Sequence, residues 1–220
     1  MNKKIKRLSD LLEKEYGKKA WRVHGDPLSV LIGTILSQNT SDNNSHKAFA
    51  NLKSTFKDWD EVRKAKVKKV ADTIRSGGLA DIKALRIKNI LSQIIEENGS
   101  LNLSFLKRWQ TNKIKSWLRR FKGVGEKTIA CVLLFSLNRP AMPVDTHVLR
   151  VSKRTGLVSQ NSNAAQAEVL LEKLIPKNWI YQFHLNLIAH GRMICKPANP
   201  LCQDCVLLEN CEFGKSYSRL

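Results

Sequence analysis

Two side chains in the middle of the sequence could carry out chemistry on a nucleic acid: the amine of Lys127 and the carboxylate of Asp145. Lys127 stands two residues after the segment Gly123-Val124-Gly125, whose two glycines allow a tight turn. A helix that begins after such a turn presents unpaired backbone N–H groups, which suit a phosphate. An amine and a carboxylate beside a phosphate-binding turn indicate chemistry on the sugar or backbone of a nucleic acid.

The turn lies between two predicted helices. Apolar residues before it fall at helical spacing, and apolar residues after it lie on one helical face. The first set is Ile114, Trp117, Leu118 and Phe121, and the second is Ile129, Val132 and Leu133. The pattern predicts helix, four-residue hairpin at 122–125, helix, over about residues 112–137.

Four of the five cysteines lie within 17 residues, at positions 195, 202, 205 and 211. Such a cluster in an intracellular protein indicates a metal centre rather than disulfides. Four thiolates this close can bind one tetrahedral zinc ion or one iron–sulfur cluster. Zinc ribbons usually present two C-x2-C pairs, whereas only Cys202 and Cys205 form such a pair here.

The chain of 220 residues is strongly basic, with 38 Lys and Arg against 19 Asp and Glu and a net charge of +19. Residues 101–130, around the hairpin, hold eight basic side chains and one acid, Glu126. So concentrated a positive charge predicts a polyanionic partner, of which nucleic acid is the one that fits. No apolar run approaches the roughly 18 residues of a membrane-spanning helix, and the first 17 residues do not form a secretory signal.

Helical periodicity dominates the rest of the chain, and the sequence predicts an all-α protein. Asp26-Pro27 marks the start of a helix, because Asp is a good N-cap and Pro suits the first helical position. That helix runs into a polar break at 37–42, and a later helix ends at the turn Gly77-Gly78-Leu79.

Residues 121–129, FKGVGEKTI, and 144–151, VDTHVLRV, together resemble the helix-hairpin-helix DNA glycosylases of the endonuclease III branch. That branch carries L-x-G-V-G-x-K-T-A followed by V-D-T-H-[VI]-x-R-V. Phe121 and Ile129 are apolar departures from the pattern, and Glu126 stands where an Arg is expected. The 6-2-5 spacing of the four clustered cysteines also matches the iron–sulfur loop of that branch.

The resemblance implies a two-domain helical fold. A six-helix barrel with the helix-hairpin-helix motif would span residues 23–137. Residues 1–22 and 138–220 would form a discontinuous helical domain, with a 4Fe–4S loop at 195–211. The cofactor would be a 4Fe–4S cluster bound by Cys195, Cys202, Cys205 and Cys211.

The resemblance also assigns the catalytic roles. Lys127 would attack the sugar and form a Schiff base, and Asp145 would stabilise the positive charge that develops as the glycosidic bond breaks. From the residues alone, Asp145 could equally be the N-cap of the helix that begins at Thr146. Gly123, Val124 and Gly125 would bind the DNA backbone, and His147 would organise the turn at Asp145.

An enzyme of this kind must extrude a base and fill the gap that it leaves. Leu79 matches one gap-filling position of the branch. Asn39 aligns with the other, where the family carries Gln, and the neighbouring Gln38 could fill it instead, so the choice between them stays open.

We therefore expect a bifunctional DNA glycosylase and apurinic/apyrimidinic lyase of base excision repair, acting on damaged, oxidised pyrimidines. The alternatives are a glycosylase of the same fold for mismatched thymine or uracil and a non-catalytic DNA-binding module. Its partner would be double-stranded DNA with damaged bases or abasic sites. We expect a monomer without a membrane association, located in the cytoplasm or nucleoid of a prokaryote.

Overall fold

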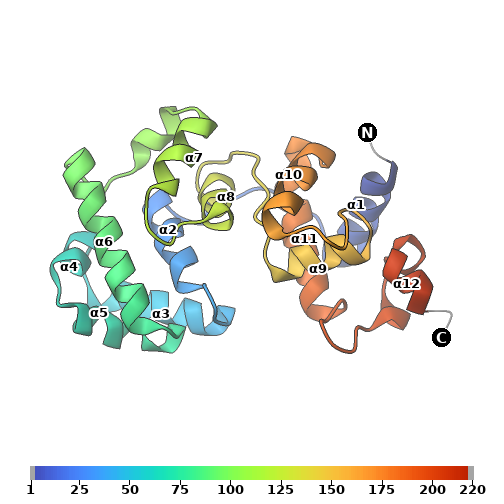
Figure 1. The fold of residues 1–220 in the computed structure, drawn as a ribbon, viewed down its shortest axis with the longest axis horizontal. Helices are drawn as coiled ribbons and strands as arrows, with labels where there is room; N and C mark the ends of the chain where they lie inside the picture. The colour runs from blue at the N-terminus through green and yellow to red at the C-terminus, as the bar shows by residue number, and fades with distance from the viewer. Residues whose placement is uncertain (1–2, 218–220) are drawn as a thin grey trace. The chain divides into compact units, whose positions relative to one another are not determined.

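The computed structural model describes residues 3–217, and within that range it contains helices and turns but no strand (Figure 1). The α-helices are α1 (Lys3–Tyr16), α2 (Pro27–Leu36), α3 (Asp42–Thr55), α4 (Trp59–Lys64), α5 (Val67–Thr73), α6 (Ala80–Asn98), α7 (Thr111–Arg119), α8 (Glu126–Phe135), α9 (Thr146–Arg154), α10 (Ala164–Leu174), α11 (Ile180–Met193) and α12 (Glu212–Tyr217). Short 3-10 helices are η1 (Arg75–Gly77), η2 (Ser104–Arg108), η3 (Lys177–Trp179), η4 (Cys202–Asp204) and η5 (Leu208–Asn210). The all-α prediction is confirmed.

The helices form two compact units. The central unit consists of Val23–Leu137, and the terminal unit combines the chain up to Arg22 with the chain from Asn138 onward. Among residues 3–217, no helix has the length and hydrophobicity needed to cross a bilayer.

In the central unit, the apolar helix α2 lies against α3, α6 and α8. Asp26 begins α2 by accepting hydrogen bonds from the backbone N–H groups of Leu28 and Ser29, both at 3.0 Å. This is the N-cap that the Asp-Pro pair predicts. Burial of the apolar side chains that α2 shares with its neighbours stabilises the helices on which the hairpin stands.

Helix α7 buries Ile114, Trp117 and Leu118 but ends at Arg119, so Phe121 lies beyond the helix rather than on its last turn. The chain tightens there because the N–H of Phe121 bonds to the carbonyl of Leu118, three residues back. Phe121 is nevertheless buried, and its ring packs edge-on against Trp117 with centroids 4.9 Å apart. The helical spacing therefore identified a core residue but misplaced the end of the helix.

In the terminal unit, α11 lies against α1 and α9. The approach of α9 to α11 requires a glycine, because a Cβ at Gly191 would lie 2.8 Å from the Cβ of His147. Helix α9 begins at the turn that carries Asp145, and α11 leads directly into the cysteine loop. The pair α9 and α11 thus positions both the turn at Asp145 and the cysteine loop at 195–211.

Candidate nucleic-acid interface and metal centre

The hairpin between α7 and α8 leaves the start of α8 uncapped. Gly123 has a φ of 85°, a left-handed backbone that favours glycine, whereas Gly125 is extended. Gly125 is the N-cap residue of α8, and no side chain bonds to the first N–H groups of the helix. Because four N–H groups at a helix start lack helical partners, this terminus can bind an anion such as a phosphate.

Lys127 lies at the edge of an open groove beside these N–H groups. The groove has an empty volume of about 730 Å³, which includes open solvent. It is lined by Thr34 and Gln38 from the α2 side, by residues 123–125 of the hairpin, and by Lys127 and Thr128 of α8. Lys127 is exposed and has no hydrogen-bond or ion-pair partner among residues 3–217, so its amine is available to a ligand.

Glu126, the departure from the family pattern, is paired within the hairpin. Arg119 donates two hydrogen bonds to its carboxylate, at 2.7 and 3.0 Å. These bonds hold the pKa of Glu126 below its usual value. The negative charge next to Lys127 is therefore balanced by Arg119, across the turn.

The polar break after α2 contacts the same hairpin through Gln38. Its amide donates to the carbonyl of Gly123 at 3.1 Å, and Arg86 of α6 donates to its carbonyl oxygen at 2.6 Å. Asn39, by contrast, is exposed at the tip of the turn and has a φ of 53°. Gln38 thus supports the hairpin, while Asn39 is the residue that projects.

Leu79 projects from a second turn of the central unit. It precedes α6 with a φ of 49° and a ψ of 39°, and 53% of its surface is exposed. A left-handed backbone costs a residue other than glycine about 1–2 kcal/mol. Such strain in an exposed apolar side chain points to a function, because neither packing nor backbone preference explains it.

Asp145 is the N-cap of α9: its Oδ1 accepts a hydrogen bond from the N–H of Val148 at 2.7 Å. The N-cap role considered from sequence is therefore real. Its other carboxylate oxygen has no hydrogen-bond partner among the described residues, so the N-cap role leaves that oxygen for a ligand. His147 lies near Arg150, with His147 Nδ1 and Arg150 Nη2 3.1 Å apart, and against Gly191 of α11.

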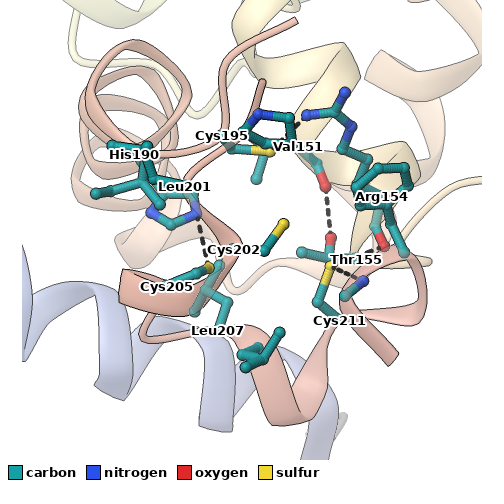
Figure 2. A pocket seen from close by; sticks show the side chains of 15 residues that line it. Val151, Arg154, Thr155, His190, Cys195, Leu201, Cys202, Cys205, Leu207 and Cys211 are labelled. Atoms are coloured by element: carbon teal, nitrogen blue, oxygen red, sulfur yellow. Dashed lines mark hydrogen bonds between the residues drawn. The ribbon is translucent and has the colours of Figure 1, made fainter. Parts of the chain in front are cut away.

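The four clustered cysteines line one cavity of the terminal unit, with an empty volume of about 340 Å³ that includes open solvent (Figure 2). Cys195 lies two residues beyond α11, Cys202 begins η4, Cys205 follows η4, and Cys211 follows η5. Nowhere in the described chain do three or more His, Cys, Asp or Glu side chains converge on a single-ion position. The four thiols therefore share one cavity but do not form a ready-made single-ion site.

Polar groups also converge on these sulfurs. Arg154 donates to the Sγ of Cys195 at 3.4 Å, and the N–H of Gly214 donates to the Sγ of Cys211 at 3.4 Å. Burial raises the pKa of Cys205 to about 11 and also raises the pKa of Cys202 and Cys211. These thiols would bind a metal only by losing protons, and the N–H donors would then stabilise the thiolates.

His190 adds a further contact to this cavity. Its Nε2 lies 3.6 Å from the Sγ of Cys205, and its Nδ1 lies 2.9 Å from the hydroxyl of Tyr16. Burial lowers the pKa of His190 to about 4, so the ring is neutral at neutral pH and carries one N–H. If the Tyr16 hydroxyl donates to Nδ1, that N–H lies on Nε2 and is directed to Cys205.

Sequence reasoning included Arg150 in the matched motif but gave neither Arg150 nor Arg154 its role, which is to bind the cysteine loop to α9. Arg150 donates to the carbonyls of Cys195 and Gly191, at 2.8 and 2.7 Å. Arg154 donates to the carbonyls of Lys196 and Pro197, at 2.7 and 3.0 Å. Their spacing of four residues on one helix was the available signal, since it places both on one face.

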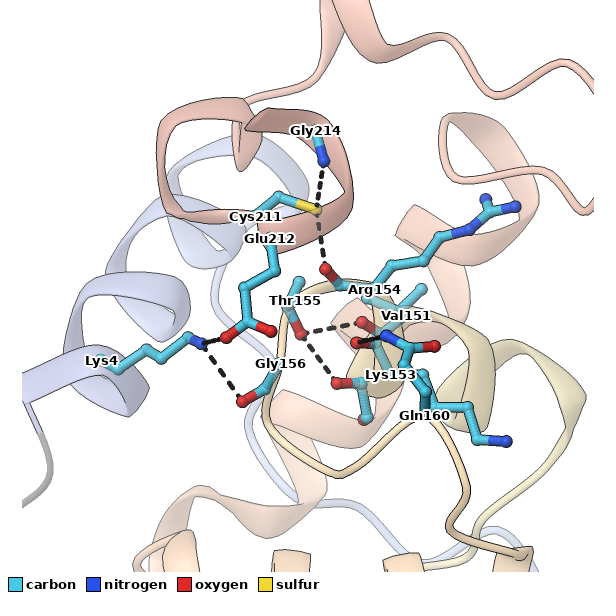
Figure 3. Close-up of polar contacts among 11 residues, drawn as sticks. Lys4, Val151, Lys153, Arg154, Thr155, Gly156, Gln160, Cys211, Glu212 and Gly214 are labelled. Atoms are coloured by element: carbon cyan, nitrogen blue, oxygen red, sulfur yellow. Dashed lines mark hydrogen bonds and ion pairs between the residues drawn. The ribbon is translucent and has the colours of Figure 1, made fainter. Parts of the chain in front are cut away.

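On the other side of the loop, Glu212, next to Cys211, joins the loop to α1 (Figure 3). Lys4 donates to the carboxylate of Glu212 at 2.9 Å and to the carbonyl of Gly156 at 3.2 Å. Gly156 has a φ of 67°, and a Cβ there would overlap the same carboxylate. These contacts are partly exposed, so they contribute little to stability by themselves.

A family model described as the HhH-GPD superfamily of base excision DNA repair proteins matches residues 32–177. The chain is 42% identical over 166 residues to a putative DNA glycosylase of Arabidopsis thaliana, an alignment that covers 76% of this chain and 57% of that protein. It is 37% identical over 188 residues to endonuclease III of Thermotoga maritima, covering 86% and 84% of the two chains. A solved structure of a trapped covalent intermediate of endonuclease III with DNA superposes with a TM-score of 0.85, at 30% identity and with full coverage of both chains.

Proposed function

The chain belongs to the HhH-GPD superfamily of base excision DNA repair proteins and is an endonuclease III-like DNA glycosylase, and we propose that it also cleaves the strand as an apurinic/apyrimidinic lyase. The observation that carries this proposal is Lys127. Its amine is exposed at the groove beside the uncapped start of α8, where it has no partner within residues 3–217. A lysine so placed can reach a sugar whose phosphate the hairpin binds.

Lys127 must be neutral to act as a nucleophile. It is exposed in the free protein, at the edge of the groove. The amine then attacks C1′ of the damaged nucleotide while the bond to the base breaks and its electron pair leaves with the base. One nitrogen proton neutralises the departing base and the other passes to O4′ as the C1′–O4′ bond breaks, which gives a Schiff base. Loss of a proton from C2′ then expels the 3′ phosphate by β-elimination.

Asp145 would act on the same sugar. Departure of the base leaves positive charge on the sugar ring, and a carboxylate close to it lowers the energy of that state. Because Oδ1 of Asp145 is held by the N–H of Val148, the side chain is fixed in orientation before the substrate binds. The second oxygen remains for the developing charge.

We propose that Cys195, Cys202, Cys205 and Cys211 bind a 4Fe–4S cluster. Support comes from four thiols around one cavity, from N–H donors aimed at their sulfurs, and from the likeness to endonuclease III. A cluster bound there would supply cross-links between the segments of the loop. The residues themselves place that loop against α9, through Arg150 and Arg154.

The functional test is borohydride trapping on DNA. We expect the protein to form a covalent adduct with a duplex that contains an abasic site, and Lys127→Ala to abolish it. Lys122→Ala is the matched control, because Lys122 is also an exposed lysine of the hairpin. Normal trapping by Lys127→Ala would refute the lyase assignment and leave an enzyme that only removes bases.

Asp145→Asn keeps the shape of the side chain and removes its charge. We expect lesion binding to persist and base removal to slow by about 10²–10³-fold, the usual effect of deleting one electrostatic stabiliser. A panel of duplexes with oxidised pyrimidines, uracil or mismatched thymine would identify the substrate. We propose oxidised pyrimidines, and faster release of mismatched thymine would favour the alternative specificity.

A further inference from the structure

Lys83, near the start of α6, is almost completely buried, with 1% of its surface exposed. A buried ammonium group is costly unless hydrogen bonds replace its lost water. Its Nζ donates to the backbone carbonyls of Leu36 and Gly77, both at 2.7 Å. Burial lowers the pKa of Lys83, and these two carbonyl dipoles favour its charged form.

The two carbonyls belong to different turns. Leu36 is the last residue of α2, where helix carbonyls lose their regular partners, and Gly77 is the last residue of η1. The turns are also packed together, because a Cβ at Gly77 would lie 3.1 Å from the Cβ of Ala48 and 3.8 Å from the oxygen of Leu36. The residues at which the two turns begin, Leu36 and Gly77, therefore lie side by side, and the ammonium of Lys83 binds the carbonyl of each.

Both turns lead to a projecting residue with a left-handed backbone. Asn39 follows Leu36 with a φ of 53°, and Leu79 follows Gly77 with a φ of 49°. Both side chains are exposed. For leucine this conformation is strained, and it persists only where the surrounding structure prevents it from relaxing. The shared bonds to Lys83 supply such a restraint at the base of each turn.

We propose that Lys83 is a positioning residue that holds the turn at 37–41 and the turn at 78–79 as one rigid wedge, so that Asn39 and Leu79 enter a damaged duplex together. This role rests on the proposed base-removal function, in which those two residues fill the gap left by an extruded base. Lys83 is buried and does not reach DNA itself. It acts by fixing two turns that would otherwise have to be ordered when DNA binds.

Lys88 of the same helix provides a matched control. Its Nζ also donates to two backbone carbonyls, those of Arg63 and Ala65. Burial lowers its pKa as well. Arg63 lies at the end of α4 and Ala65 just beyond it, so neither carbonyl belongs to a projecting turn. Lys88→Met thus removes the same chemistry without releasing the wedge.

The experiment measures insertion of the wedge rather than catalysis. Each variant is made together with Lys127→Ala and bound at saturation to a duplex in which 2-aminopurine stands opposite a stable tetrahydrofuran abasic analogue. Insertion unstacks the 2-aminopurine and raises its fluorescence. We expect Lys83→Met to lower the insertion equilibrium about tenfold, equivalent to about 1.4 kcal/mol, and Lys88→Met to leave it nearly unchanged.

A double-mutant cycle tests the mechanism. If Lys83 acts through the wedge, adding Leu79→Ala to Lys83→Met should lower insertion by less than the product of the single effects. Lys83→Gln retains an amide donor for one of the carbonyls, and it should give an intermediate loss. It also serves as the test variant if Lys83→Met does not fold, as judged by circular dichroism.

The outcomes are distinct. Equal effects of Lys83→Met and Lys88→Met, with a large loss for Leu79→Ala, would overturn the positioning role and leave the wedge intact. No effect of Leu79→Ala would overturn both the wedge and the role of Lys83. Borohydride trapping measures only the Schiff base formed by Lys127. A failure of the lyase proposal would therefore be seen separately from the two fluorescence outcomes.

Discussion

The central unit and the terminal unit stabilise their functional turns by different means. In the central unit, Gln38 bonds to the hairpin carbonyl of Gly123, and Lys83 bonds to the carbonyls that precede both projecting turns. In the terminal unit, the loop at 195–211 consists of short turns folded around a cavity lined by four thiols. In the central unit, hydrogen bonds from the protein's own side chains hold the turns. In the terminal unit, we propose that a metal cluster bound to the four sulfurs joins the segments of the loop.

This difference separates what each unit needs in order to fold. A turn fixed by backbone carbonyls and a buried ammonium forms whenever its helices pack. A loop whose buried thiols have raised pKa values gains its cross-links only when a metal centre displaces their protons. We therefore expect the central unit to keep its structure when the cofactor is lost, and the cysteine loop to lose it.

The largest expected effect is that of removing one of the four cysteines that we propose as cluster ligands. Cys202→Ala should give protein with less iron and sulfide, and the amide protons of residues 195–217 should lose most of their protection from hydrogen exchange. Protection in the central unit should stay the same. Freshly purified wild-type protein should be yellow-brown, with iron and sulfide each near four per chain, as a cubane cluster requires.

Cys131→Ala is the control for that experiment. Cys131 is a buried cysteine of α8 in the central unit, where it packs as a small apolar residue. This variant should keep the full iron content and the protection of the loop. Equal loss of protection in both units after Cys202→Ala would contradict the proposed independence of the central unit, and colourless wild-type protein with one zinc would refute the cluster.

A pair of glycine substitutions tests whether the central unit holds the hairpin by its own contacts. Gly123→Ala places a methyl group on a residue with a φ of 85°, and 2.2 Å from the Nε of Arg86. The left-handed backbone alone should lower the stability by about 1–2 kcal/mol. In addition, Arg86 would have to move away from Gln38 to make room for the methyl group. DNA binding should weaken further, because the turn loses the support of Gln38. Thermal unfolding and fluorescence anisotropy would measure the two effects.

Gly125→Ala is the matched substitution two residues away. Gly125 is extended, and no atom lies within 4 Å of a Cβ at that position, so the fold should not change. Any loss of binding would then report a contact with DNA itself. It should be equal for damaged and undamaged duplexes if, as we propose, the turn contacts the backbone and not the bases. A loss confined to one lesion would show that the hairpin reads the base.

The sequence predicted the helices and their turns well, because those follow from local patterns. Asp26-Pro27 correctly predicted the start of α2, and the glycines at 123 and 125 correctly predicted the turn between α7 and α8. It did not reveal which of its 38 basic residues are buried, and so Lys83 was not distinguished from the surface lysines. The partners of Lys83 are backbone carbonyls. Every residue has such a carbonyl, so the residue types in the sequence do not show which ones bind a lysine.

Two further features were beyond sequence reasoning for similar reasons. The left-handed backbone of Leu79 could not be predicted, because leucine rarely adopts it and only the adjacent glycines marked a turn. The choice between Gln38 and Asn39 was left open because both are polar and adjacent. The structure shows that Gln38 bonds to the carbonyl of Gly123, 85 residues away, and a contact so distant in the chain has no local sequence signal.

The smallest expected effect concerns the ion pair between Glu126 and Arg119, which closes the hairpin across its turn. Arg119 lowers the pKa of Glu126 below its ordinary value of 4.5. The pair therefore contributes stability above pH 4.5, and this contribution is lost as the pH falls through the lower value of the folded protein. Both side chains are partly exposed, so the contribution is small and decreases with added salt.

Glu126→Gln should remove that part of the acid dependence of thermal unfolding and leave unfolding at neutral pH nearly unchanged. It also removes a negative charge from the start of α8 and releases Arg119 from the pair, so binding of undamaged DNA should tighten by about twofold at low salt. Asp60→Asn is a suitable control, because Asp60 is another paired acid of the central unit, bonded to Arg63 and Lys64 of α4. If Asp60→Asn tightens binding equally, the effect belongs to the net charge of the protein. If only Glu126→Gln does so, the hairpin is where the central unit binds the DNA backbone.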